Sequence, residues 1–385
     1  MNSDVIISGG GIIGNYIASR LSKNDIETLI IEKSKENTAP LVNIRTLTLN
    51  HFSKKLLDDL DINIPYASIN QIIVFDGDGS GKIEFSASEI KEKDLSYVVF
   101  FNDLQRELKK LVSKNTLFEQ QIISISQEKS LNFCDISLEN NINIKSSFLA
   151  GCEGKNSSVA KLCNFEEIAD NYHQTAITFT VFSDLEKHNQ AYQIFSEKGI
   201  FAIMPLPKQI DGPSHTIVWS VENKKLNDIS IDEYVTENLS FFEKKLKIKM
   251  TVASELLSFN LSNHHYKKYV SGAIALVGDA AHSIHPLAGQ GINLGFADAE
   301  ALCEEIINGF EKSISLDKKL ILKRYEIRRK DMNLTMLKSM DFFVNLFKSD
   351  NLYIKVLRNF GLSSVNKTRF LKKFFINQAV GKNNI

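Results

Sequence analysis

The stretch Asp4-Val5-Ile6-Ile7-Ser8-Gly9-Gly10-Gly11-Ile12-Ile13-Gly14 decides how this chain begins to fold. A short apolar strand over residues 4–8 runs into three glycines, and the pattern from Gly14 to Lys23 predicts a helix. A second apolar strand is expected over 27–31, so this region predicts a βαβ unit and therefore a parallel sheet. The pattern G-x-G-x-x-G between a strand and a helix is typical of dinucleotide-binding folds.

Each glycine of this turn has a separate expected role. Gly9 makes the turn, and Gly11 lets the backbone approach a pyrophosphate at the positive end of the helix. Gly14, together with Ala18, lets the helix and the strand pack closely. Glu32 follows at the tip of the second strand, where a carboxylate can accept hydrogen bonds from ribose hydroxyls but would repel a 2′-phosphate. The segment therefore predicts FAD or NAD as the ligand.

The composition is that of a globular chain of 385 residues, 43% hydrophobic and 24% charged. It excludes collagen, coiled coil and wholesale disorder, and at roughly 150 residues per domain it predicts two or three domain-sized units. The 46 basic residues balance the 46 acidic ones, so we expect no nucleic-acid partner.

Apolar runs in the chain are strand-sized, far short of the roughly 20 residues that span a bilayer. The N-terminus lacks the basic region of a signal peptide, so we expect a cytoplasmic protein. The cysteines show no C-x-x-C spacing, which predicts buried reduced thiols at Cys134, Cys152, Cys163 and Cys303.

Two kinds of pattern alternate along the rest of the chain. Residues 44–60 show helical spacing, and 103–112 form a second amphipathic stretch. Residues 69–90, and several segments from 172 to 262, alternate as the strands of an antiparallel sheet do. A strand over 273–277 then returns to the opening pattern.

A helix is expected from about 291 to 307, and from Lys319 the chain is predicted to be helical to near its end. These patterns predict an α/β fold with a discontinuous Rossmann-like domain, an antiparallel-sheet domain and a helical C-terminal region. The expected boundaries are 1–70, 96–171 and 263–318 for the first, 71–95 and 172–262 for the second, and 319–385 for the third.

A second motif narrows the choice of ligand. It reads Gly278-Asp279-Ala280-Ala281-His282-Ser283-Ile284-His285-Pro286-Leu287-Ala288-Gly289-Gln290-Gly291-Ile292-Asn293-Leu294-Gly295. A strand delivers Asp279, whose carboxylate can bind a polyol hydroxyl, and the glycine-rich turn leads into a helix whose N-terminus stabilises an anion. A flavin has both a ribityl chain and a ring that becomes anionic when reduced, which favours FAD over NAD.

This motif resembles the signature of the class A flavoprotein aromatic hydroxylases, in particular the ubiquinone-biosynthesis branch with its His-Pro-x-Ala-Gly-Gln-Gly-x-Asn-Leu-Gly run. The resemblance extends over nearly the whole chain, through 45–49, 174–176, 195–207 and 325–333. It implies the p-hydroxybenzoate hydroxylase-like fold and an FAD-dependent monooxygenase. It also implies NADPH or NADH as a transient electron donor, O2 as co-substrate, and a polyprenylated aromatic precursor of ubiquinone as substrate.

The resemblance implies the roles of further residues. Arg45 would contact the cofactor near its phosphates or ring, and Asn102 or Gln105 would stand in for a polar flavin contact. Asp279 would hold the ribityl chain. Residues expected to shape the pocket beside the flavin ring are Pro286, Gly289, Gly291, Ile292 and Asn293. The sequence does not identify a side chain that would act as the base activating the substrate phenol, and the resemblance implies that the oxygen-transfer chemistry takes place on the flavin, next to Pro286, Gly289 and Gly291.

The chain departs from the family pattern at two places. The family's Asp-Gly motif has Glu153 in place of the aspartate, and Ala160 in place of an arginine. The extra methylene moves a carboxylate that the family ties to flavin and nicotinamide interactions. Phe100 and Phe101 occupy places where a polar pair is usual.

Two other patterns imitate metal sites. Residues 76–81 resemble the first half of an EF-hand loop, but position 12 of such a loop is Ala87, so a tight turn between strands is expected. The pair His282 and His285 lies inside the flavin motif, and His264 with His265 lies among lysines. We therefore predict no metal.

Apolar residues at helical spacing over 336–347, and again over 370–375 among basic residues, allow two interpretations of the C-terminal region. The helices pack on the body of the protein, or a basic and apolar surface rests on the inner face of a membrane or on other quinone-biosynthesis proteins. Two alternative functions also stay open: a hydroxylase or epoxidase of another aromatic or lipid, and a non-catalytic FAD-binding scaffold. A plain NAD-dependent dehydrogenase is disfavoured because it does not account for the second motif.

Overall fold

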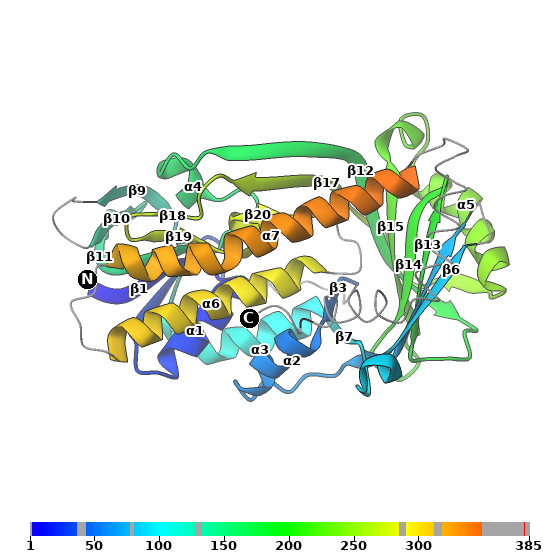
Figure 1. Ribbon diagram of the computed structural model, residues 1–385, viewed down its shortest axis with the longest axis horizontal. Helices are drawn as coiled ribbons and strands as arrows, with labels where there is room; N and C mark the ends of the chain where they lie inside the picture. Colours follow the sequence, from blue (N-terminus) through cyan, green and yellow to red (C-terminus); the bar gives the residue numbers. More distant parts are fainter. Residues whose placement is uncertain are drawn as a thin grey trace.

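The computed structural model describes residues 2–36, 44–77, 81–127, 133–284, 290–311, 318–348 and 381. Two large sheets lie at the two ends of an elongated molecule, and long helices run between them (Figure 1). The predicted α/β fold, with a parallel Rossmann-like sheet, an antiparallel sheet and C-terminal helices, is confirmed. The boundaries of the three domains remain a prediction.

The first sheet carries the opening βαβ unit. Its core is parallel, because β1 (Asn2–Ser8) pairs in parallel with both β2 (Thr28–Glu32) and β11 (Asn143–Gly151). The order β18-β19-β11-β1-β2-β8 is completed by β18 (Val270–Ser271), β19 (Ile274–Leu276) and β8 (Thr116–Phe118). In addition, β10 (Cys134–Leu138) pairs antiparallel with β11, and β9 (Ile122–Gln127) pairs antiparallel with β10. Val5, Ile6 and Ile7 are fully buried, as expected for a parallel strand covered on both faces.

Helices cover this sheet. The helix α1 (Ile12–Ser22) packs between α3 (Phe101–Val112) and α6 (Gln290–Glu311), all on one side of the sheet (Figure 1). A short helix, α4 (Ser158–Leu162), follows β11. The start of α1 therefore lies beside the carboxyl end of β1, where ligands of open parallel sheets bind.

The second sheet has the order β20-β17-β12-β15-β14-β13-β5-β6. It is antiparallel except that β5 and β13 run parallel, and its strands are β5 (Gln71–Asp76), β6 (Lys82–Ser86), β12 (Glu167–Ser183), β13 (Gln190–Ser196), β14 (Gly199–Pro205), β15 (His215–Glu222), β16 (Met250–Val252), β17 (Leu257–Tyr266) and β20 (His282–Ser283). The helix α5 (Ile231–Leu246) covers one face, where Phe242 stacks on Phe201 at 4.1 Å between ring centroids. Trp219 is fully buried against both rings. The opposite face of the sheet turns toward the first sheet.

A small third sheet connects the two, and it corrects one prediction. The spacing over 44–60 predicts a continuous helix, but β3 (Thr46–Leu49) precedes α2 (His51–Asp58). In the sheet, β3 and β4 (Ala67–Ile69) pair with β7 (Ser96–Phe100). Asn50 ends the strand and caps α2, since its side chain accepts a hydrogen bond from Ser53 N. Alternating Thr and Leu at 46–49 fit both a strand and a helical stripe, and pairing with β7 decides for the strand.

The C-terminal part contains α7 (Lys318–Lys348), which runs along α6 toward the second sheet (Figure 1). Met340, near its end, packs against Phe195 of that sheet. The apolar and basic stretch over 370–375 lies outside the described residues. Among the helices that are described, none has the length and apolarity needed to cross a bilayer.

Candidate active site

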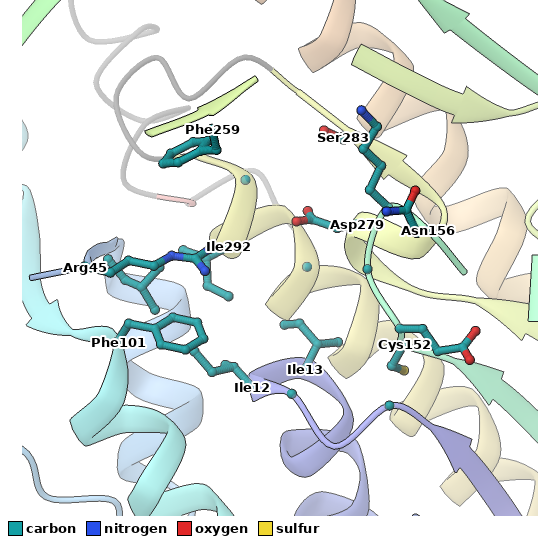
Figure 2. A pocket seen from close by; sticks show the side chains of 18 of the residues that line it. Ile12, Ile13, Arg45, Phe101, Cys152, Asn156, Phe259, Asp279, Ser283 and Ile292 are labelled. Carbon is teal, nitrogen blue, oxygen red and sulfur yellow. The ribbon is translucent and has the colours of Figure 1, made fainter. Parts of the chain in front are cut away.

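A cavity of about 710 Å³ lies where the two large sheets face each other. Its walls come from the β1–α1 turn, the start of β3, the start of α3, the turn after β11, the segment after β19 and the start of α6. Figure 2 shows Arg45 and Phe101 on one wall, Asp279 on the facing wall, and Ile12 and Ile13 below them.

The β1–α1 turn forms the glycine cradle expected from the sequence. Gly9 has a φ of 103°, which favours glycine, and its N–H donates to Ile31 O at 2.9 Å. A Cβ on Gly14 would lie 2.0 Å from Gly9 O, so a side chain there is excluded. A Cβ on Gly11 would meet nothing within 4 Å, because this position opens into the cavity. No side chain caps α1, so its first N–H groups stay available to an anion.

Glu32 ends β2 and lines the cavity. Its carboxylate accepts hydrogen bonds from Gly10 N at 2.6 Å and from Ser34 N at 2.8 Å. It therefore holds the cradle in place, and its remaining lone pairs can accept hydrogen bonds from the hydroxyls of a ribose.

Arg45 and Asp279 bring opposite charges to the cavity. Burial lowers the pKa of Arg45, and the carboxylate of Asp279 partly offsets this. Desolvation raises the pKa of Asp279, while His282 and Arg45 act in the opposite direction. Both side chains line the cavity and point toward its interior (Figure 2).

Residues of α6 and β17 fix the backbone around Asp279. Gly278 has a φ of 60° and lies next to Gly295 of α6, where small residues allow a close approach. His264, on β17, contacts Asp279 O through Nε2 at 3.0 Å. The carboxylate of Asp279 is thus presented to the cavity by a fixed backbone.

The start of α6 contributes Gly291, Ile292 and Gly295 to the lining. Asn293 is buried instead: its Oδ1 accepts from Asn50 N and Ser53 Oγ, and its Nδ2 donates to Thr48 O. Its carboxamide therefore joins α6 to β3 and α2 rather than lining the cavity. Pro286 and Gly289 lie outside the described residues.

Gln105 lies half-buried on α3 and is not among the residues that line the cavity. Phe101, one turn earlier, takes that place. Residues four apart share one face of a helix, and Phe101, the first residue of α3, lies one turn nearer the cavity than Gln105.

Glu153 lines the cavity, and its carboxylate is fully engaged. It accepts hydrogen bonds from the hydroxyls of Ser8, Ser157 and Ser158 and from Val159 N. The extra methylene relative to aspartate is accommodated by this ring of donors at the start of α4. Ala160 is buried under the same turn.

Several lining residues were missed by sequence reasoning. They come from the second sheet and are Thr178, Ala202, Met204, Val218, Phe259, Asn260 and Leu261. Alternation along the strands was the available signal, but it does not tell which face meets the first sheet. The packing of Thr46 on Thr216, and of Thr48 on Met204, fixes that choice.

The described part of the chain holds no group of three or more His, Cys, Asp or Glu side chains that could bind a metal ion. Asp76 is buried at the end of β5. Residues 78–80 of the EF-hand-like turn, and His285, lie outside the described residues.

The glycine cradle, the acidic residue at the tip of β2 and the second acidic motif facing it define an α/β protein of the dinucleotide-binding class. The family model described as FAD binding domain matches residues 2–338. The chain belongs to this family and is a flavoprotein monooxygenase with the p-hydroxybenzoate hydroxylase-like fold, as the sequence motifs predicted.

Curated relatives align over nearly the full length of the chain. The ubiquinone biosynthesis monooxygenase of Dictyostelium discoideum is 27% identical, with 98% of this chain and 91% of the relative covered. The 3-demethoxyubiquinol 3-hydroxylase of Escherichia coli is 26% identical, with 98% of each chain covered. The ubiquinone hydroxylase of Rhodospirillum rubrum is 26% identical, with 98% of this chain and 90% of the relative covered.

Solved structures share the fold. The p-nitrophenol 4-monooxygenase of Pseudomonas putida superposes with a TM-score of 0.79 at 16% identity, covering 98% of each chain. A variant of HpxO from Klebsiella pneumoniae, in complex with FAD, gives a TM-score of 0.78 at 16% identity, again covering 98% of each chain.

Proposed function

We propose that the cavity binds FAD and that the protein hydroxylates the aromatic ring of a polyprenylated ubiquinone precursor. The observation that carries this proposal is that one cavity holds two binding subsites. The glycine cradle with Glu32 suits an adenosine and pyrophosphate, and Asp279 suits a ribityl chain. The curated ubiquinone hydroxylases among its relatives support the choice of substrate.

Each residue that the sequence predicts for the site takes a role in this proposal. Gly9, Gly11 and Gly14 admit the pyrophosphate to the start of α1, and Glu32 accepts from the ribose. Arg45 supplies a positive charge to the phosphates or the flavin ring. Around the flavin, the proposed contacts are Asp279, Gly291, Ile292 and the expected residues Pro286 and Gly289, while Asn293 positions the start of α6 and Gln105 lies outside the lining.

The substrate ring would lie against the second sheet. Thr178, Ala202 and Val218 form a floor of small side chains there, and Phe259 borders it. A flat ring needs such a floor, and the apolar surroundings help to exclude water during oxygen transfer.

Bound FAD would supply the redox chemistry, in which a reduced nicotinamide is the electron donor and O2 provides the oxygen atom. The residues of this chain bind and orient the cofactor and the ring, and they shield both from water. The chain has no second glycine motif for a nicotinamide nucleotide, so NADPH or NADH would bind transiently. We place the protein in the cytoplasm, with the C-terminal region as the part that would meet a membrane surface or other quinone-biosynthesis proteins.

Anaerobic reduction of the purified protein by NADH and by NADPH tests the proposal. Mixing the reduced protein with isotopically labelled O2 and a polyprenyl-phenol should give a product that carries one labelled oxygen, detected by mass spectrometry. A simple phenol and an unrelated lipid serve as comparison substrates. Bound FAD that neither nicotinamide reduces, even with substrate, would contradict the enzyme and favour a scaffold. Preferential hydroxylation of a comparison substrate would contradict the quinone precursor.

A further inference from the structure

Phe101 lies directly against Arg45 in the cavity (Figure 2). The guanidinium carbon of Arg45 is 4.4 Å from the centroid of the Phe101 ring, which is a cation–π contact. The two residues are also joined through the backbone, since Phe101 N donates to Arg45 O at 3.0 Å. The backbone at the start of β3 and at the start of α3 therefore holds the ring and the cation next to each other.

The guanidinium of Arg45 makes no hydrogen bond or ion pair with the side chains that the structure describes. The opposite charge that raises the pKa of Arg45 is the carboxylate of Asp279, across the cavity. A long arginine side chain without a bonded partner would sample many rotamers. The ring of Phe101, over which the guanidinium carbon lies, restricts this freedom without supplying a carboxylate or amide oxygen that would accept hydrogen bonds from the guanidinium.

We propose that Phe101 is a positioning residue that fixes the guanidinium of Arg45 for the anionic part of the cofactor. A carboxylate or amide at this place would occupy some of the N–H donors that a phosphate or a flavin carbonyl needs. An aromatic ring fixes the cation and occupies none of them. The inference rests on the proposed binding of FAD in this cavity.

A double-mutant cycle tests the inference. Phe101→Leu removes the ring face but keeps apolar volume, Phe101→Tyr keeps the face, and Arg45→Met removes the cation. FAD affinity is measured by titrating the apoprotein and following the quenching of flavin fluorescence, and the thermal midpoint of each apoprotein is recorded. Phe52→Leu on α2 is the matched control, because Phe52 packs half-buried on the core and does not line the cavity.

We expect Phe101→Leu to weaken FAD binding about tenfold in the wild-type background and less than about twofold in the Arg45→Met background. Phe101→Tyr should bind FAD within about twofold of wild type, because it keeps the ring face. Equal weakening by Phe101→Leu in both backgrounds, or none in the first, would overturn the positioning role while wild-type FAD binding still upholds the proposed function. A wild-type protein that fails to bind FAD would overturn both.

Discussion

Single residues in the cavity act through small differences in space and charge. Gly14 and Gly11 belong to the same turn, yet an added methyl group would meet Gly9 O at 2.0 Å in the first case and open space in the second. Asp279 presents a carboxylate that no described hydrogen bond occupies, while Glu32 shares its oxygens with two backbone N–H groups. Each of these positions can therefore be tested by its own substitution.

Replacing Gly14 with alanine should lower the free energy of unfolding by about 1–3 kcal/mol, because the turn or α1 must shift. Gly11→Ala should leave the stability of the apoprotein within about 0.5 kcal/mol but weaken FAD binding, since its methyl group points into the cavity. Urea unfolding of both apoproteins and FAD titration make the comparison. Equal loss of stability in the two variants would contradict the assignment of the cavity side.

Asp279→Asn should weaken FAD binding by roughly ten- to a hundredfold, because a hydrogen bond to a charged acceptor contributes about 1.5–3 kcal/mol. Flavin content after gel filtration and the dissociation constant of the apoprotein are the measurements. Asp58→Asn, on the exposed side of α2, is the control. A variant of Asp279 that purifies with a full complement of flavin would refute its role.

At the scale of elements, α6 and α7 are held together by a buried charged network. Asp298 of α6 accepts from His282 Nε2 at 2.5 Å, from Arg329 Nε at 2.7 Å and from Asn333 Nδ2 at 2.9 Å. Burial by itself would raise the pKa of Asp298, but His282 and Arg329 outweigh it and lower this pKa to about 2. Because His282 follows Asp279 closely in the chain, the network ties α7 to the segment that carries Asp279.

Asp298→Ala should lower the free energy of unfolding by about 3–5 kcal/mol, since it removes the carboxylate that balances the buried positive charge of Arg329. Urea unfolding at neutral pH provides the measurement, with Asp331→Ala on the exposed side of α7 as the control. A loss similar to that of the control would show that the charged pair contributes little.

The strand β15 begins with a buried histidine that gives stability a dependence on pH. Burial, and to a lesser degree His188, lowers the pKa of His215 from 6.5 to about 4. The folded state therefore binds fewer protons than the unfolded chain between about pH 6.5 and pH 4, so stability falls as the pH drops through this window. His215→Gln should flatten that part of the stability profile in urea unfolding, whereas a profile unchanged from wild type would reject the role of His215.

At the scale of the whole molecule, the cavity exists because the two large sheets meet across β3. Thr46 and Thr48 of β3 contact Thr216 and Met204 of the second sheet, and Met340 of α7 packs on Phe195 of the same sheet. The strip between these contacts carries the small side chains of Ala202 and Val218. The packing of the two sheets therefore decides whether a ligand can reach this strip.

Ala202→Phe should fill this floor and weaken binding of a polyprenyl-phenol by about tenfold or more, while the flavin content stays close to that of wild type. Substrate-induced changes in the flavin absorption spectrum give the affinity. Ala253→Phe, exposed beyond the end of β16, is the matched control. Undiminished substrate binding by Ala202→Phe would show that the ring lies elsewhere in the cavity.

The sequence by itself determined those parts of the protein that depend on residues close together in the chain. The glycine turn, the strand and helix beside it, Glu32 and the Gly278-Asp279 motif could be recognised because backbone freedom and charge at fixed spacing suffice to describe them. Only the tertiary structure decided that residues 46–49 form a strand, that Phe101 rather than Gln105 meets the cavity, and that Asn293 bonds to β3 and α2. These outcomes depend on partners far away in the chain, and the energy of such contacts is absent from any local pattern.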